Sequence, residues 1–565
     1  MAKIRKWKSK NVHSSVKASF GFSKYFKAVW QVVARFQPFF SIFVALLVCI
    51  PLAYAITLVV PQLQTIGTKN EFHEGVVDSM HYVDPFPQTP LDAPFSQLNR
   101  DVTRRLFDPL FVSDAEGTPV GAIADKYTIT DSAEKFTITL KNRQWSDGQT
   151  IKSSDVVDTF NLIKKLGGSS IYSAAVDGVK ISAQDDSTVV FQLDAPNSAF
   201  LETLSWPVLP SAQITLDYTG MIQGEFGRNP ITSTGWSIKK ITANNISLKS
   251  PQGNILEFIF YENKSSVEKA MDAGFIDGYY ATAIPTDRKF TDMYKYILPR
   301  QIYSLYFNLT AGTPLKDPSL RKAISYAINR DEIANGIGEV QPSVINNKSW
   351  AYNPAVNTYP YNIDQGNKLL DNLGYTSQNG ERFKNGQRLE STLSVPNIPL
   401  REDQANKIKD QLKLIGITVN VQVVKDSDIF ENVLKTNLFY TSIVLTRNFE
   451  AMIYSVDSGL DPDKFSQWSS STIPNLETKT IGLNFAGYTN ERVNTFLFQG
   501  RKQTDQAARK TPYNQFQKVF YEDAPVVTLY NPYLFYVVNK KVKNVDFTGA
   551  LRIEDRFINF DQWEF

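Results

Sequence analysis

Apolar residues recur with two different periods along the middle of the chain. Residues 136–140 and 189–193 alternate apolar and polar positions, which predicts half-buried strands. Asp317 and Pro318 suit the N-cap and first turn of a helix, and apolar residues follow them at helical spacing as far as Ile328. A helix is therefore predicted to begin at this proline.

A helix followed directly by a strand is predicted further along. Apolar residues at helical spacing between 405 and 415 end at Gly416, and Ile or Val then alternates with polar residues over 417–423. This succession indicates an α/β lobe. Near the C-terminus, two apolar strands over 526–530 and 534–538 are separated by Asn531 and Pro532, which predict a turn.

The composition predicts a folded body of more than one lobe. The chain has 565 residues, of which 42% are hydrophobic, and a single core stops growing at roughly 250 to 300 residues. The formal net charge is +3, yet the first 36 residues contain nine Lys or Arg and no acidic residue. The remainder is acidic overall, so nucleic-acid binding by the body is not expected.

The N-terminal segment predicts a membrane anchor. Residues 39–60 are apolar and uncharged over the length that spans hydrocarbon. The basic residues of 1–38 predict a cytoplasmic tail, 61–70 a tether, and the rest a body that is extracellular or periplasmic. Two alternatives stay open. Ala53, Tyr54 and Ala55 have the pattern of a signal-peptide cleavage site, and Cys49, the only cysteine in the sequence, is a candidate for lipidation.

The residue types required for catalysis are sparse. The chain has three histidines, two of them (His73 and His81) in the predicted body, and it lacks the His-Glu-x-x-His pattern of zinc enzymes. Ser-x-x-Lys matches, among them Ser237/Lys240, Ser266/Lys269 and Ser319/Lys322, occur without the partner motifs of the serine-lysine enzymes, and no phosphate-binding glycine loop is present. We therefore expect a binding protein rather than an enzyme, with no cofactor, no metal site and no catalytic residue.

A series of short segments, kept in order, resembles the bacterial extracellular solute-binding proteins of family 5, which serve dipeptide, oligopeptide and nickel importers. The most specific block joins Trp145, Ser146, Asp147 and Gly148 to the segment 153–157. The other segments are 106–110, 114–117, 122–125, 135–141, 235–236, 306–308, 369–375, 416–417, 461–463, 487–488 and 524–525.

The resemblance implies an α/β fold of the two-lobed periplasmic-binding-protein type II kind with an extra domain, here preceded by one transmembrane helix. Lobe I is expected from 71–113, 229–305 and 525–565, the extra domain from 114–228, and lobe III from 306–524.

The resemblance also implies a function and a site. The chain is expected to be the substrate-binding component of an ABC importer, a monomer that captures peptides by cleft closure and delivers them to the permease subunits. Asp457, which precedes an aspartate-proline step, is the candidate anchor for the peptide ammonium. The candidate cleft residues are Asn99, Asp101, Trp236, Tyr306, Phe307, Asn308, Asp461 and Trp468, with Asp463 as a further alternative anchor. A nickel or other small-solute binding protein, or a membrane-tethered sensor or adhesin, remains the alternative.

Overall fold

The computed structural model divides the chain into two compact units, Met1–Thr68 and Lys69–Phe565. It describes residues 70–86, 94–114, 116–166, 172, 175–215, 217–310, 312–424, 443–444, 446–475 and 482–565. The predicted tail and anchor, and all of the tether but its last residue, lie outside these ranges. Among the helices that are described, none combines the length and the apolar character that a membrane crossing requires.

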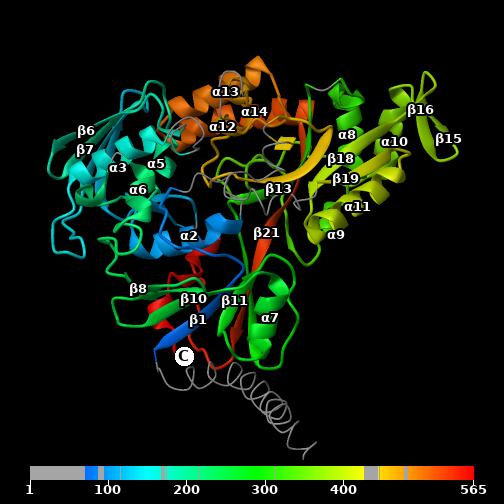
Figure 1. Ribbon diagram of the computed structural model, residues 1–565. Helices are drawn as coiled ribbons and strands as arrows, with labels where there is room; N and C mark the ends of the chain where they lie inside the picture. The colour runs from blue at the N-terminus through cyan, green and yellow to red at the C-terminus, as the bar shows by residue number, and fades with distance from the viewer. Residues whose placement is uncertain are drawn as a thin grey trace, which may run out of the picture. The chain divides into compact units, whose positions relative to one another are not determined.

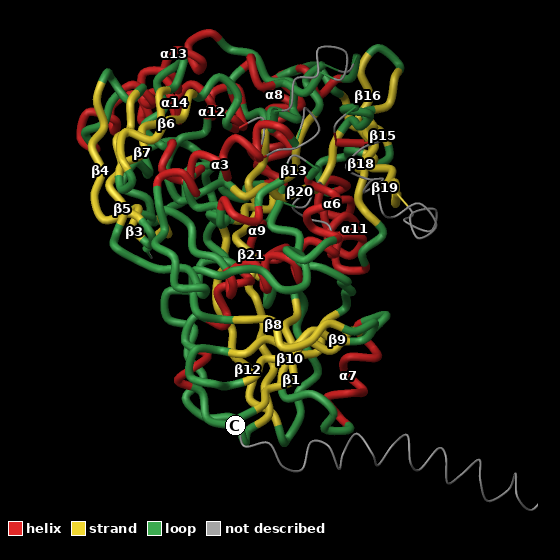
Figure 2. Tube along the Cα trace, turned by 60° about the vertical axis from the view of Figure 1, so that its left-hand side comes forward, coloured by secondary structure: helices red, strands yellow, loops and turns green. Residues whose placement is uncertain are grey.

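The segments expected in lobe I contain one end of a large sheet, in the strand order β11-β1-β10-β9-β8. Strand β1 lies parallel to both β10 and β11. The helix α7 connects β10 to β11, which makes a βαβ crossover. Figures 1 and 2 show these elements together in the lower part of the view. They are β1 (Glu71–Val76), β8 (Ser237–Ile241), β9 (Asn245–Lys249), β10 (Ile255–Phe260), α7 (Lys264–Asp272) and β11 (Gly278–Ala281).

The segment expected as the extra domain contains a four-stranded antiparallel sheet in the order β4-β5-β7-β6. The two strands predicted from alternation are confirmed as β5 and β7, and buried positions alternate along β5. The helix α3 packs on β6 and β7. The elements are β4 (Ala124–Thr130), β5 (Lys135–Leu140), α3 (Ser153–Lys165), β6 (Lys180–Asp185) and β7 (Thr188–Gln192).

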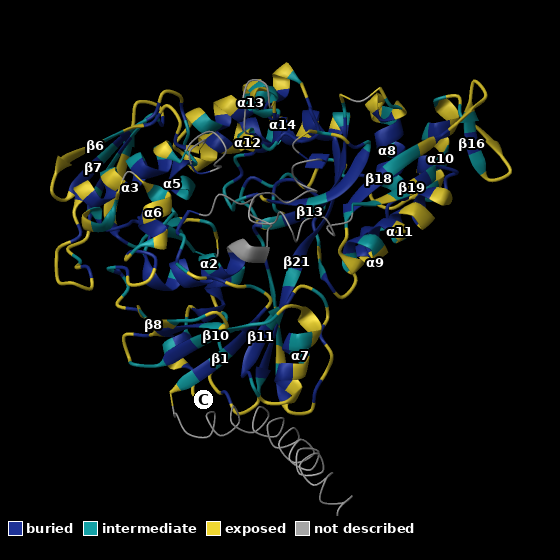
Figure 3. Ribbon diagram, viewed as in Figure 1, coloured by how far each residue is buried: buried dark blue, intermediate teal, exposed yellow. Residues whose placement is uncertain are grey.

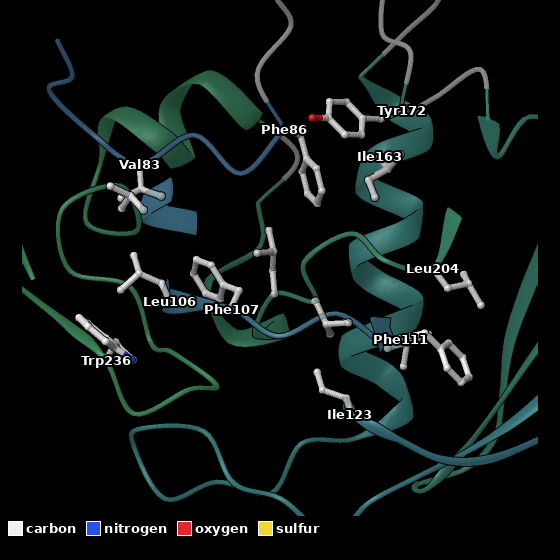
Figure 4. Close-up of a cluster of buried hydrophobic side chains, with 14 of the residues drawn as sticks. Val83, Phe86, Leu106, Phe107, Phe111, Ile123, Ile163, Tyr172, Leu204 and Trp236 are labelled. Atoms are coloured by element: carbon white, nitrogen blue, oxygen red, sulfur yellow. The ribbon is translucent and has the colours of Figure 1, made fainter. Parts of the chain in front are cut away.

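One hydrophobic core joins the extra domain to lobe I. Figure 4 shows Ile163 of α3 in the same buried cluster as Phe107 and Trp236, which come from segments expected in lobe I. The two parts therefore share apolar contacts across the boundary expected near residue 113.

The segment expected in lobe III, with the strand β13 that leads into it, contains the other end of the sheet, in the order β19-β18-β20-β13, with separate hydrophobic cores on its two faces. The predicted helix after Asp317 is confirmed as α8, and the predicted helix and strand around Gly416 are confirmed as α11 and β19. The elements are β13 (Gln301–Phe307), α8 (Pro318–Ala327), β18 (Glu390–Pro396), α11 (Pro399–Lys413), β19 (Thr418–Val424), β20 (Ala451–Asp457), α12 (Phe465–Trp468), α13 (Glu491–Lys502) and α14 (Gln506–Asp523).

The turn predicted at Asn531 and Pro532 is wrong, because a single strand, β21 (Val526–Asn539), runs through both residues. Its first half pairs with β13, and its second half pairs with β11 and with β12 (Thr291–Ile297). Pro532 lies where the partner changes, and its carbonyl accepts a hydrogen bond from the Leu298 backbone N–H at 2.9 Å. The missing proline donor is tolerated at such a position.

Strand β21 therefore joins the two ends of the large sheet into one. Figure 1 shows it descending from the region of β13 to that of β11, and in Figure 3 it is mostly buried. The Asn531 side chain donates to the carbonyls of Gln301 at 2.6 Å and Pro299 at 3.3 Å. This amide ties β21 to the connection between β12 and β13, which is the neighbouring crossing between the lobes.

Candidate ligand-binding cavity

A cavity of about 640 Å³ lies where lobe I, the extra domain and lobe III meet. Its lining comes from α2 (Pro94–Leu106), from α5 (Phe200–Thr203), from the connection that contains Arg300, and from the segments 457–467 and 551–554. The volume lies within the roughly 300 to 1,000 Å³ typical of small-molecule sites. It could hold about 20 water molecules at their share of liquid volume, so the cavity suits a hydrated polar ligand.

Asp457, the predicted ammonium anchor, ends strand β20 and lines this cavity. Its Oδ1 lies 3.0 Å from Nη2 of Arg300, and its Oδ2 accepts from Nε of Arg300 at 3.2 Å. The Gly459 backbone N–H also donates to Oδ1 at 2.9 Å. Burial by itself would raise the pKa of Asp457, but the charges of Arg300 and Arg552 and the hydrogen bonds from Gly459 and Arg300 together outweigh it, and the pKa is lowered. The carboxylate is therefore ionised and already held by one cation.

Glu202 of α5 links the extra domain to the same cluster. Its Oε1 accepts from the backbone N–H groups of Leu460 at 3.0 Å and Asp461 at 3.1 Å, and it lies 3.6 Å from Nη1 of Arg300. Gly459 has φ +62, and a Cβ atom there would lie 2.3 Å from Oε2 of Glu202. The glycine therefore permits both the left-handed turn and the close approach of the carboxylate. We call Arg300, Asp457, Glu202 and the 459–461 turn the hinge cluster.

Of the nine predicted site residues, the cavity lining includes Asn99 and Asp457. The Asn99 Oδ1 accepts from the Asp84 backbone N–H at 3.1 Å, which holds this side chain at the cavity wall. Asp463, the alternative anchor, also lines the cavity and forms an ion pair with Arg501 at 2.9 Å.

Two predicted carboxylates are corrected, because each is paired with an arginine outside the cavity lining. Asp101 is fully buried and accepts two hydrogen bonds of 2.7 Å from Arg556. Asp461 accepts from Nη1 and Nη2 of Arg509 at 2.8 and 2.5 Å. Unlike Asp457, neither carboxylate lines the cavity.

The four predicted cleft aromatics, Trp236, Tyr306, Phe307 and Trp468, are corrected as core residues. Each is buried in one of the hydrophobic clusters. Tyr306 and Phe307 are neighbours on β13 and point to opposite faces of the sheet, into different cores.

Two of these aromatics pack against each other. Trp468 stacks on Tyr306 with ring centroids 6.0 Å apart. Asn308, predicted beside them, is also structural, since its amide donates to the carbonyls of Arg447 at 2.7 Å and Phe449 at 2.9 Å.

Sequence reasoning missed the charged residues that shape the cavity, above all Arg300, Glu202 and Arg552. One signal was available for Arg300, because this arginine lies close to the lobe boundary expected after residue 305. Glu202 and Arg552 lie in segments without a marked pattern, and the tertiary fold brings them to the cavity.

Comparison with known proteins places this architecture in a family. The profile described as "Bacterial extracellular solute-binding proteins, family 5 Middle" matches residues 118–475. The oligopeptide-binding protein AppA of Bacillus subtilis is 23% identical over 459 residues, covering 76% of this chain and 82% of AppA. The probable D,D-dipeptide-binding periplasmic protein DdpA of Escherichia coli is 26% identical over 456 residues, covering 76% of this chain and 83% of DdpA.

Solved structures share the fold over nearly the whole described body. Bacillus subtilis AppA in complex with a nonapeptide has a TM-score of 0.66 at 20% identity, covering 87% of this chain and 98% of AppA. Campylobacter jejuni NikZ in complex with Ni(L-His) has a TM-score of 0.70 at 21% identity, covering 88% of this chain and 100% of NikZ. The predicted α/β fold of the family is confirmed. The chain belongs to the bacterial extracellular solute-binding proteins of family 5.

Proposed function

We propose that this protein is the substrate-binding component of an ABC importer, and that it captures peptides in the cavity and delivers them to the permease subunits. The observation that carries the proposal is the cavity itself, which is lined by all three parts of a family 5 fold. Relatives that match over most of the chain are named as oligopeptide-binding and D,D-dipeptide-binding proteins. A solute held at this junction would stabilise the closed arrangement of the lobes.

Asp457 is proposed as the acceptor for the peptide ammonium. An ionised carboxylate offers about four lone-pair positions, and Arg300 and the Gly459 N–H occupy three of them. The Asp457 side chain is 33% exposed. One position is left for an N–H donor of the ligand. One charge-assisted hydrogen bond contributes about 1.5 to 3 kcal/mol, so a few would supply the roughly 8 kcal/mol of micromolar affinity.

The N-terminal segment is proposed as the anchor of the binding protein. An apolar segment over 39–60 behind a basic tail would keep the body at the outer face of the membrane, close to the permease. We propose a monomer, because one cavity formed within one chain is sufficient for capture.

Native mass spectrometry of the full chain, purified gently in mild detergent, tests peptide capture. A ladder of peptide masses released on denaturation is expected. A co-purified metal complex or sugar would contradict the proposal.

Replacing Asp457 by Asn tests the ammonium site. Peptides with a free N-terminus should bind roughly 10- to 150-fold more weakly, which corresponds to one charge-assisted hydrogen bond, whereas N-acetylated peptides should be unaffected. The exposed Asp186→Asn is the matched control. Equal affinities of the Asp457→Asn variant and the original protein for free peptides would remove Asp457 from this role.

A further inference from the structure

Arg552 differs from the other arginines of the cavity. Five arginines line it, and four of them lie within 4.0 Å of a carboxylate oxygen: Arg100 at 3.9 Å, Arg104 at 3.5 Å, Arg300 at 3.0 Å and Arg501 at 2.9 Å. Arg552 has no such partner among the described residues. Its guanidinium donates one long hydrogen bond, from Nη2 to Oγ of Ser205 at 3.4 Å.

The backbone of Arg552 is held on a rigid base. It precedes the short helix η6 (Ile553–Phe557), and its backbone N–H donates to Oδ2 of Asp555 at 3.1 Å. In the same helix Arg556 is fully buried between Glu74 at 3.1 Å and Asp101 at 2.7 Å. These contacts tie the C-terminal segment to β1 and α2. Arg552, which lines the cavity, is therefore presented from a fixed backbone position.

The surroundings of Arg552 leave its charge incompletely compensated. Burial and, next, repulsion by the charge of Arg300 lower the pKa of Arg552, while Glu554 and Asp457 act in the opposite direction. A guanidinium presents up to five N–H donors in a planar fork that matches a carboxylate. Arg552 is half-buried, and a partly desolvated charge without a close partner is costly, so an anion that enters the cavity would relieve this cost.

We propose that Arg552 binds a carboxylate of the captured ligand, and that it thereby selects for ligands that carry an anionic group. This inference rests on the proposed function as a binding protein. It adds a second charged contact to the proposed site. The ligand ammonium would bind at Asp457 and the ligand carboxylate at Arg552. The carboxylate can come from the C-terminus of a peptide or from an acidic side chain. Amidation of the C-terminus removes the first carboxylate and leaves the second in place.

Isothermal titration calorimetry on the full chain tests the proposal with three probes: trialanine, its C-terminal amide, and the amide of Ala-Glu-Ala. The original protein should bind the free acid roughly 10- to 150-fold more tightly than the trialanine amide, as expected for one charge-assisted pair. In Arg552→Gln this preference should disappear, and Arg552→Lys should restore part of it. The exposed Arg492→Gln is the charge-matched control and should keep the full preference. Tight binding of the Ala-Glu-Ala amide that also requires Arg552 would identify a side-chain carboxylate as the source.

Retention of the acid-over-amide preference in a folded Arg552→Gln protein would overturn the proposal. Mass spectrometry of co-purified ligands gives a second readout for the case that alanine peptides do not bind. Carboxylate-bearing ligands that Arg552→Gln loses would support the assignment, even if they are not peptides and the peptide function fails. Ligands without an anionic group would overturn the role of Arg552 and leave peptide capture standing. A protein that neither co-purifies with a ligand nor binds a probe would contradict both proposals.

Discussion

Glu202 connects the extra domain to lobe III across the cavity, so its replacement should change ligand affinity more than folding. One carboxylate oxygen accepts the N–H groups of Leu460 and Asp461, and the same oxygen faces Arg300. Glu202→Ala removes both acceptor contacts and leaves the 459–461 turn without its link to α5. An arrangement in which α5 separates from the 459–461 turn would lack these contacts, so their loss favours that open arrangement.

The size of the effect follows from the contacts. A hydrogen bond to a charged group contributes about 1.5 to 3 kcal/mol. The two N–H groups share one oxygen of a side chain that is 22% exposed, so we take about 3 kcal/mol for the pair together. At 1.4 kcal/mol per tenfold change, this shifts the equilibrium between open and closed forms about 100-fold. The apparent Kd rises by the full factor of about 100 if the closed form is rare in the absence of ligand. It rises by less if the closed form is already common.

Calorimetric titration with a co-purified peptide measures the affinity, and small-angle X-ray scattering measures the ligand-induced compaction. Glu202→Ala should weaken binding by up to about 100-fold and reduce the compaction, and Glu202→Gln, which keeps an acceptor oxygen, should lie between. The exposed Glu225→Ala in the extra domain serves as the control. If Glu202→Ala binds peptide with unchanged affinity and compacts fully, the carboxylate does not stabilise closure and the reasoning fails.

Two further predictions concern stability. Arg556→Gln leaves the buried carboxylates of Glu74 and Asp101 without their cation, which should lower the free energy of unfolding by about 3 to 5 kcal/mol; a Tm unchanged in calorimetry would contradict this. Burial is the largest of several influences on the Glu74 carboxyl and raises its pKa to about 7, so the folded protein keeps a proton that the unfolded chain releases near pH 4.5. This contribution, at most about 3 kcal/mol, is present below pH 4.5 and is lost as the pH rises through 7. Urea unfolding at pH 5 and pH 8 should show the loss, and Glu74→Gln should reduce it; an equal pH dependence in Glu74→Gln would refute the assignment.

Local patterns predicted the regular elements well, because those patterns are set by the period of the backbone. Strands β5 and β7 follow from alternation, and α8 follows from an N-cap whose side chain accepts the Ser319 N–H at 2.8 Å. The turn expected at Pro532 failed for a reason that no local pattern contains. The missing N–H is harmless there because the strand changes partners at that point.

The sequence by itself determined the family, the α/β class and Asp457 as a cavity residue, since each depends on short segments whose order and spacing are visible in the chain. The tertiary structure decided which polar groups are available to a ligand. Asp461 and Arg509 are 48 residues apart and neutralise each other, whereas Arg552 meets Ser205 across 347 residues and keeps donors unused. Alternation shows that Tyr306 and Phe307 point to opposite faces, but only the folded chain shows that both faces are covered. Whether a polar group is available to a ligand depends on its long-range contacts. The local hydrophobic periodicity of the sequence carries no information about those contacts.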